Sequence, residues 1–417
     1  MADPINAIAE WLQNLLTGWG MAPGLALVIR FALGVIVIAT VMLVLDIFLV
    51  WLERKVVARF QVRLGPNRLG RYGLLQPFAD VLKLLIKEDT TPLGADKFLY
   101  NLAPIIALAT VLLLWGVIPY APTIVGADIN VGVLYIVAVG AIGTLGIIIA
   151  GWSSNNKYAL LGAFRAVALM ISYEVPMVLA LLIPVMLADT MGINAIVASQ
   201  NVWFIFVAPV AALIFLISAI AELGRAPFDM TEAESELVAG YVTEYSGMKF
   251  GLFYAGELLH ALTMGALFAT LFLGGWRGPF VEQIPILGAV YLLVKALFMY
   301  WVIMWVRYTL PRVRIDHMLS LNWKFFTPLA LVVLIVTALL DRILEGAGAS
   351  TLVYTLVMLG ANLLVGWITL TLLRSYARRE RVKVAEPRPV AVPPEPTGPA
   401  GGPVSAAPSV TPSTPNN

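Results

Sequence analysis

Residues 24–52 read GLALVIRFALGVIVIATVMLVLDIFLVWL and contain only two charged side chains, Arg30 and Asp46. A helix that crosses a bilayer needs about 20 consecutive, mainly apolar residues. The run shows no alternation of apolar and polar residues, which a membrane-spanning β-strand would require. Because backbone groups inside a membrane must be satisfied within the segment, this run predicts a transmembrane α-helix.

The same pattern recurs along the whole chain of 417 residues, which is 60% hydrophobic and only 12% charged. Soluble proteins are about a quarter charged, so the chain has too little polar surface for a soluble particle of its size. We therefore predict an all-α integral membrane protein with about nine transmembrane helices. The predicted spans are 24–52, 98–118, 131–151, 159–188, 201–221, 251–273, 286–307, 326–342 and 351–373.

Positive charge is distributed unevenly between the connections. Lys and Arg concentrate in the loop 53–97, in the alternate connections on the same side, and after residue 373, whereas the opposite side carries only Arg277 and Arg342. An excess of Lys and Arg marks the cytoplasmic side of a membrane. We expect the N-terminus outside, and the C-terminus and the long loops in the cytoplasm, in a cell inner (plasma) membrane.

These boundaries divide the chain into four parts. Residues 1–23 predict an amphipathic helix on the outer surface, and residues 24–342 a core of eight membrane helices with cytoplasmic loops 53–97 and 222–250. Residues 343–383 hold the ninth span and a basic flank. Residues 384–417 are rich in Pro, Ala, Gly, Ser and Thr, so we expect a disordered tail.

Several kinds of chemistry are excluded by composition. The chain has no cysteine, and its only histidines are His260 and His317, so it cannot hold an iron–sulfur cluster, a Cys/His zinc site or a pair of bis-His haems. It also lacks a glycine-rich phosphate loop after a strand, so we expect no bound flavin nucleotide. We expect no nucleic acid partner. Any redox centre must belong to partner proteins, and no complete catalytic site is expected on this chain.

Ionisable residues lie inside the predicted spans, where a charged side chain costs about 2.5–3.5 kcal/mol of insertion free energy and is usually functional. They are Arg30, Asp46, Arg165, Glu174, Glu257, His260 and Lys295. Glu174 is the strongest candidate, since it lies deep in its span and precedes Pro176. A desolvated carboxylate that favours its neutral form suits a proton relay. A buried bridge to another helix is the alternative. Arg30, Asp46 and Glu257 lie near span ends, where snorkelling to the interface is the simpler explanation.

The two long cytoplasmic loops carry patterns of their own. In the first loop, apolar residues form one helical face and charged residues another, which predicts an amphipathic helix that roofs a cavity or anchors the loop at the membrane surface. The apolar face comprises Leu74, Leu75, Phe78, Leu82, Leu85 and Ile86. The second loop contains Glu222, Asp229, Glu232, Glu234, Glu236 and Glu244. Its acidic row suggests proton or cation handling, with a solvated face as the alternative.

Four stretches together resemble one family. They are the first loop with Glu53-Arg54-Lys55, Arg63-Leu-Gly-Pro-Asn67 and Tyr72-Gly-Leu-Leu-Gln-Pro-Phe-Ala-Asp80; the run AELGRAPFDMTEAESELVAGYVTEY at 221–245; Ser172-Tyr-Glu-Val-Pro176; and Pro311-Arg-Val-Arg-Ile-Asp316. They resemble the H subunit, the quinone-chamber membrane subunit, of proton-pumping NADH–quinone oxidoreductase, respiratory complex I. The resemblance covers about 50–330 in the correct order. The ninth span and the Pro-rich tail have no counterpart in the minimal family pattern.

The resemblance implies a subunit at the foot of the membrane arm, whose helices and loops enclose a chamber for a quinone (ubiquinone or menaquinone). Its implied partners are iron–sulfur subunits of the hydrophilic arm and antiporter-like membrane subunits. The implied chamber residues are Glu53, Arg54, Arg63, Asp80, Arg225, Arg312 and Arg314. The implied proton path comprises Glu174, Glu222, Asp229, Glu232, Glu234 and Glu257.

Other functions remain open at this stage. The chain could be a stand-alone proton or cation carrier that uses Glu174, Lys295 and the acidic loop, or a purely structural anchor for a soluble redox arm. A membrane subunit of an energy-converting hydrogenase or a related dehydrogenase would share the same resemblance.

Overall fold

The computed structural model describes residues 4–229, 238–348 and 350–385. The chain divides into two units, Met1–Thr369 and Leu370–Asn417. Over the described residues it contains helices and no strand, as predicted.

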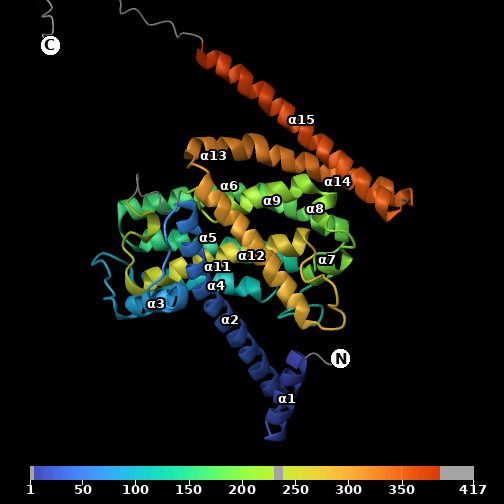
Figure 1. The fold of residues 1–417 in the computed structure, drawn as a ribbon. Helices are drawn as coiled ribbons and strands as arrows, with labels where there is room; N and C mark the ends of the chain where they lie inside the picture. Colours follow the sequence, from blue (N-terminus) through green and yellow to red (C-terminus); the bar gives the residue numbers. More distant parts are fainter. Residues whose placement is uncertain (1–3, 230–237, 349, 386–417) are drawn as a thin grey trace, which may run out of the picture. The chain divides into compact units, whose positions relative to one another are not determined.

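The helices follow one another in the order shown in Figure 1. They are α1 (Pro4–Gly18), α2 (Pro23–Phe60), η1 (Arg71–Gly73), α3 (Gln76–Ile86), α4 (Lys97–Trp115), α5 (Gly132–Ser153), α6 (Lys157–Ala188), α7 (Ile193–Ser199), α8 (Phe204–Val207), α9 (Pro209–Glu222), η2 (Gly240–Val242), α11 (Gly247–Phe272), α12 (Ile286–Thr309), α13 (Ile315–Leu321), η3 (Asn322–Phe326), α14 (Thr327–Gly346) and α15 (Thr351–Ala385).

Eight helices in the described part of the chain are long and apolar enough to cross a membrane. They correspond to every predicted span except 201–221, and α13, η3 and α14 together form one of them, Ile315–Gly346. Helix length and composition therefore support eight of the nine predicted spans. At residues 201–221 the chain forms two shorter helices, α8 and α9, and the 14 residues of α9 extend about 21 Å, less than the roughly 30 Å of a bilayer core.

The interruption between α8 and α9 has a local cause. Pro209 has no backbone N–H, and its ring disfavours helical dihedrals in the residue before it. Ala208 accordingly lies outside the helical region, with φ −133° and ψ 64°. Asn362 of α15 donates to the carbonyl oxygen of Val207 at 3.3 Å, so the ninth predicted helix contacts the interruption directly.

The helix α2 is longer than predicted, since it continues from the membrane span through Glu53 to Phe60. The first eight residues of the predicted loop 53–97 are therefore helical. Nothing in the sequence interrupts helical hydrogen bonding before Gly65 and Pro66, so the charged segment after the span stays helical. Glu53 is consequently held by a rigid element.

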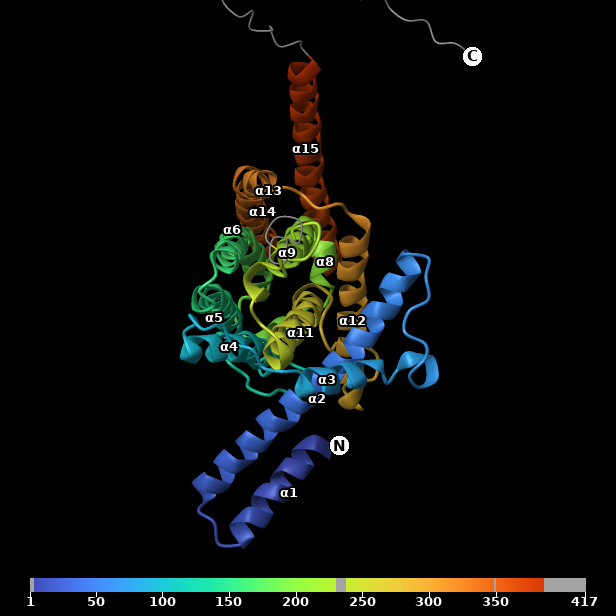
Figure 2. The same cartoon turned by 90° about the vertical axis from the view of Figure 1, so that its left-hand side faces the viewer.

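The helix α11 occupies the centre of the bundle, and 83% of its most apolar window is buried. Figure 2 shows α4, α6, α9 and α12 around it. A Cβ atom on Gly265 would lie 2.9 Å from the carbonyl oxygen of Ala296 in α12, which shows how closely these two backbones approach. Side chains carried by α11 therefore face several helices at once.

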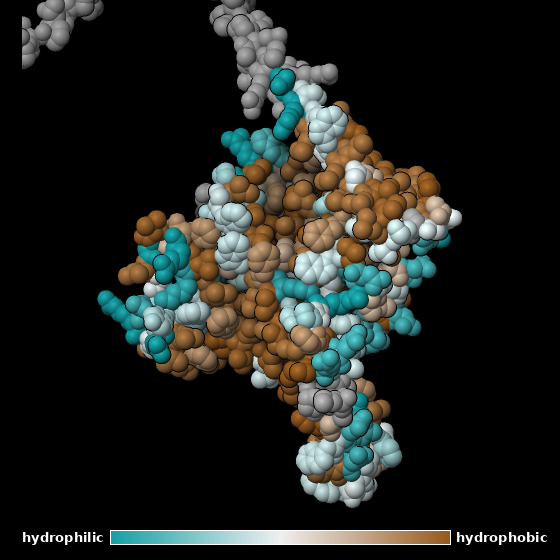
Figure 3. Space-filling model, turned by 45° about the vertical axis from the view of Figure 1, so that its right-hand side comes forward, coloured by the Kyte–Doolittle hydropathy of each residue, from teal (hydrophilic) through white to brown (hydrophobic). Residues whose placement is uncertain are grey.

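Large hydrophobic side chains cover much of the outer surface, as the face in Figure 3 shows. The most apolar windows of α2 and α15 are only 17% buried. Contiguous exposed apolar surface of this extent is typical of lipid or protein contacts in a membrane. The apolar face of α3 is exposed as well, including Phe78 and Leu82. The helix predicted in the first loop is thus present, with its apolar side turned away from this chain.

The predicted disordered tail falls almost entirely on residues 386–417, which lie outside the described residues. The helix α15 extends to Ala385, slightly beyond the predicted tail boundary at residue 384.

Candidate functional site

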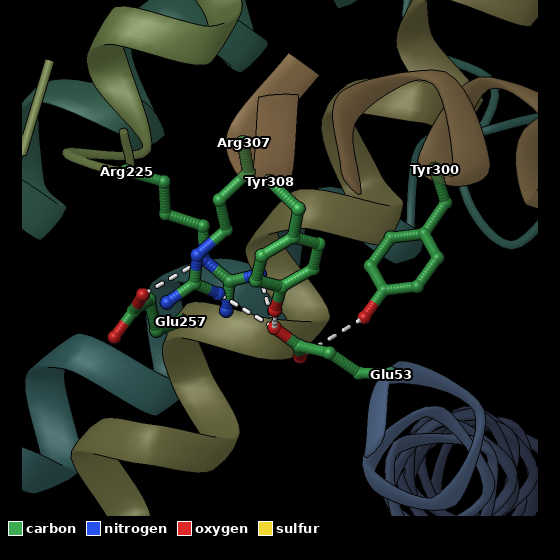
Figure 4. A network of polar contacts seen from close by, with 6 residues as sticks. All are labelled: Glu53, Arg225, Glu257, Tyr300, Arg307 and Tyr308. Atoms are coloured by element: carbon green, nitrogen blue, oxygen red, sulfur yellow. Dashed lines mark hydrogen bonds and ion pairs between the residues drawn. The ribbon is translucent and has the colours of Figure 1, made fainter. Parts of the chain in front are cut away.

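A buried cluster of ion pairs joins four parts of the sequence (Figure 4). Arg225 lies just after α9, and its side chain is 1% exposed. Its Nε donates to Oε1 of Glu257 on α11 at 2.8 Å. Its Nη1 lies 3.6 Å from Oε1 of Glu53 on α2. A single guanidinium therefore links α2 and α11.

The α12 helix supplies the other partners of Glu53. Nη1 of Arg307 and the hydroxyl of Tyr308 each lie 2.6 Å from Oε1 of Glu53, and both donate to it. The hydroxyl of Tyr300 donates to Oε2 at 3.4 Å. Tyr300 and Arg307 are seven residues apart, about two helical turns, so they lie on one face of α12.

Charge in the cluster is balanced, because two arginines face two carboxylates. Burial opposes the charged form of Arg225, but the carboxylates of Glu257 and Glu53 outweigh it and raise the pKa of the guanidinium above its usual value. Among the described residues, Nη1 and Nη2 of Arg225 have no hydrogen-bond partner. Removing one member of a buried pair leaves an uncompensated charge and destabilises by about 3–5 kcal/mol. The members should therefore act as a unit.

A second contact anchors the segment that carries Arg312 and Arg314. The backbone N–H of Val313 donates to the carbonyl oxygen of Pro227 at 3.0 Å, which holds this segment against the loop after Arg225. Arg312 is half-buried and Arg314 is exposed. Arg312 and Arg314 thus flank a residue that contacts the loop two residues after Arg225, and neither is among the residues drawn in Figure 4.

The remaining implied chamber residues lie on α2, α3 and the turn between them. Nη1 of Arg54 is 2.5 Å from Oδ2 of Asp80, and this pair joins α2 to α3. Arg63 is exposed, and its Nε donates to Gln61 at 2.6 Å. The structure therefore pairs Arg54 with Asp80 and leaves Arg63 on the surface, apart from the buried cluster.

Two of the implied proton-path residues share a small cavity. Glu174 of α6 and Glu222 at the end of α9 both line a cavity of about 20 Å³. Glu222 also lines a second cavity of about 80 Å³, together with Glu257. Asp229 is half-buried in the loop. Glu232 and Glu234 lie outside the described residues, as does Glu236.

Two acidic residues for which the sequence favoured the membrane interface lie inside the helix bundle instead. Asp46 and Glu257 were expected to snorkel, but Asp46 is only 5% exposed, and Glu257 is bound to Arg225. Asp46 precedes Glu53 by seven residues, so both lie on one face of α2, directed into the bundle. Within the described part of the chain, Oδ1 of Asp46 has no hydrogen-bond partner. The seven-residue spacing between Asp46 and Glu53 is the feature of the sequence that could have predicted the burial of Asp46.

The ammonium group of Lys295 is bound mainly by backbone carbonyls. Its Nζ donates to the carbonyl oxygens of Leu273, Gly275 and Arg277 at 2.8, 2.8 and 3.0 Å. These carbonyls follow the C-terminus of α11, where a positive charge is favourable. The ring of Trp203 lies 5.2 Å from the same ammonium. Lys295 is thus held by three backbone carbonyls and one aromatic ring just beyond the end of α11.

Tyr300, Arg307 and Tyr308 were not identified from the sequence as site residues. Tyrosine is common in membrane helices, and Arg307 resembled an interfacial residue at the end of a span. Their role depends on the side chain of Glu53, which meets them only when α2 and α12 pack. Among the described residues, no group of three or more acidic or histidine side chains could hold a metal ion.

Comparisons with known proteins agree with this architecture. A family model described as NADH dehydrogenase matches residues 32–338. The NADH-quinone oxidoreductase H subunit of Dehalococcoides mccartyi is 50% identical over 289 residues, 69% of this chain and 80% of that protein. The H subunit of Geobacillus kaustophilus is 47% identical over 332 residues, 79% of this chain and 97% of that protein. This multi-pass membrane chain therefore belongs to the family formed by the H subunits of NADH-quinone oxidoreductase, complex I.

Proposed function

We propose that this chain forms the quinone-access chamber of its complex, at the junction with the hydrophilic arm, and couples quinone reduction to proton translocation. Its relatives are named for a reaction between NADH and a quinone. Since the chain has no cysteine, iron–sulfur partners supply the electrons in this proposal. The chain contributes a binding environment and titratable groups.

The observation that carries the proposal is the buried cluster around Glu53. It joins α2, α11, α12 and the loop after α9. A change of charge in the proposed chamber would therefore act on all four elements together. Quinone reduction takes up protons along with electrons. A buried, charge-balanced cluster responds strongly to a change of one charge nearby, because the surrounding dielectric is low.

The acidic side chains continue from the cluster into the bundle. Glu257 binds Arg225, and it shares a cavity with Glu222, which shares the next cavity with Glu174. In our proposal this succession is the start of the proton path toward neighbouring antiporter-like subunits. Asp229, Glu232 and Glu234 belong to the loop that we assign to the same path.

The proposed chamber entrance is formed by α2 and α3. The Arg54–Asp80 pair fixes α3 against α2, and the exposed apolar face of α3 and the turn before it includes Leu75, Phe78 and Leu82. Such a face suits the isoprenoid tail of a quinone. The excess of Lys and Arg on this side supports a cytoplasmic location for the loop and an outside N-terminus.

Exchange of the central carboxylate tests the proposal. In membranes that contain the assembled complex, Glu53→Gln should lower NADH:quinone turnover by about tenfold or more, about 1.4 kcal/mol in the barrier. Electron transfer from NADH to a soluble artificial acceptor should persist, since that route bypasses the chamber. Glu282→Gln is the matched control, because Glu282 lies exposed in the connection between α11 and α12. Unchanged quinone turnover in Glu53→Gln, or equal loss of both activities, would contradict the proposal.

A further inference from the structure

The two carboxylates that face the 80 Å³ cavity are bound very differently. Glu257 is held by Arg225 through a hydrogen bond of 2.8 Å. Glu222 has a side chain that is 10% exposed, and in the described part of the molecule its Oε2 has no hydrogen-bond partner. Both carboxylates nevertheless line the same cavity. A further polar group in that space would connect the two carboxylates.

His260 lies at this gap. It is three residues after Glu257 on α11, so both side chains project from the same face of the helix, one turn apart. Its Nε2 is 3.9 Å from Oε1 of Glu222. That separation is just beyond hydrogen-bond distance and closes with a small rotation of the imidazole or with one intervening water. His260 also lines the cavity that contains Glu222 and Glu257.

The cavity itself is suited to water. Its volume of about 80 Å³ exceeds what one water molecule requires, and a buried water needs several polar partners. Thr110 and Thr144 line the cavity beside the two carboxylates and the imidazole. The polar groups and the space needed for a hydrogen-bonded connection are therefore present.

We propose that His260 is the proton-transfer residue that connects the Arg225-bound Glu257 to Glu222. An imidazole can receive a proton at one ring nitrogen while it releases one from the other. The O–H bond of a protonated Glu257 breaks as its proton forms the N–H bond at Nδ1, and the N–H bond at Nε2 breaks as its proton passes to Oε1 of the ionised Glu222. The ring is neutral before and after this transfer and changes only its tautomer, and proton exchange with water in the cavity returns the Nε2–H tautomer. This inference rests on the proposed coupling function.

The test uses the assembled complex in inverted membrane vesicles and measures quinone-linked proton translocation. His260→Gln retains a donor and an acceptor but cannot take up a proton, so translocation should fall by about tenfold or more, within the range typical of general acid–base residues. His317→Gln is the matched control, because His317 is the only other histidine and is exposed on α13. It should leave translocation unchanged.

A second variant separates proton transfer from a structural role. His260→Ala enlarges the cavity, and added imidazole should restore translocation in that variant, which a role in packing alone would not allow. Near-normal translocation in His260→Gln would overturn the inference. So would a loss in His260→Ala that imidazole leaves unchanged, or a fall in assembled complex that accounts for the whole loss of activity in both variants.

The outcomes also distinguish this inference from the proposed function. If only the role of His260 is wrong, Glu53→Gln still lowers quinone turnover while His260→Gln does not lower translocation. If the proposed function is wrong, Glu53→Gln leaves quinone turnover unchanged or lowers both activities equally, whatever His260 does.

Discussion

At the scale of single residues, Glu53 is the side chain on which the cluster depends. It accepts from Arg307 and Tyr308 at 2.6 Å and from Tyr300 at 3.4 Å, and it faces Arg225. Hydrogen bonds to a charged group are roughly twice as strong as neutral ones. A carboxylate with four such neighbours is therefore held in one position between α2 and α12.

The two tyrosines of α12 allow a prediction from distance alone. Tyr308→Phe removes a short hydrogen bond to a charged group and should destabilise the purified complex by about 1.5–3 kcal/mol. Tyr300→Phe removes a longer bond and should have a clearly smaller effect. Thermal unfolding of the two variants under identical conditions provides the comparison, with quinone turnover measured alongside. An equal effect of both substitutions, or a larger one for Tyr300→Phe, would contradict the distances.

How well single residues could be predicted depended on the kind of signal available. Glu53 and Arg225 followed from the resemblance of whole stretches of sequence, and their pairing then appeared in the fold. The burial of Asp46 did not follow, because a charged residue near a span end has the same local sequence whether it faces lipid or the bundle. Only the packing of α2 against α11 and α12 decides between these environments.

At the scale of elements, apolar length predicted the membrane helices well. The exceptions have identifiable causes. Pro209 divides the predicted span 201–221 into α8 and α9, and the lack of any interruption after Leu52 lets α2 continue to Phe60. A hydropathy window averages over a proline and ignores helical continuity across a charged boundary, so it misses both.

The exposed apolar face of α3 gives a prediction for this element. Phe78→Glu or Leu82→Glu places a charge where the proposed chamber receives an isoprenoid tail, and quinone turnover and inhibitor binding should both fall about tenfold or more. NADH oxidation with a soluble artificial acceptor should remain. Lys83→Gln is a suitable control, because Lys83 is an exposed, polar neighbour on the same helix. Normal inhibitor binding in both glutamate variants would argue against a chamber wall at α3.

The helix α15 adds contacts that the minimal family pattern lacks. Asn362 donates to the carbonyl of Val207 beside the interruption between α8 and α9, and the hydroxyl of Tyr354 donates to Asp341 of α14 at 2.5 Å. These polar contacts within an apolar surface specify one docking position for Thr351–Thr369. The family match ends at residue 338, so the family resemblance alone could not predict them.

At the scale of the whole molecule, the chain combines an apolar outer surface with a buried polar cluster inside a largely apolar core. The acidic residues that matter most in the proposed path meet around α11, which carries both Glu257 and His260 and is the most deeply buried of the candidate spans in the described part of the chain. The side-chain chemistry of this protein can bind, orient and transfer protons. In the proposed function, the redox step itself belongs to its partners.

Photochemical labelling of the assembled complex tests the chamber most directly. A quinone analogue with a photoreactive group on its isoprenoid tail should label this chain within residues 53–86 and beside Arg225, and excess unmodified quinone should suppress that labelling. The Glu53→Gln complex should show weaker labelling at the same positions. Labelling confined to neighbouring subunits, or labelling of this chain that excess quinone leaves unchanged, would contradict a quinone chamber formed by this chain.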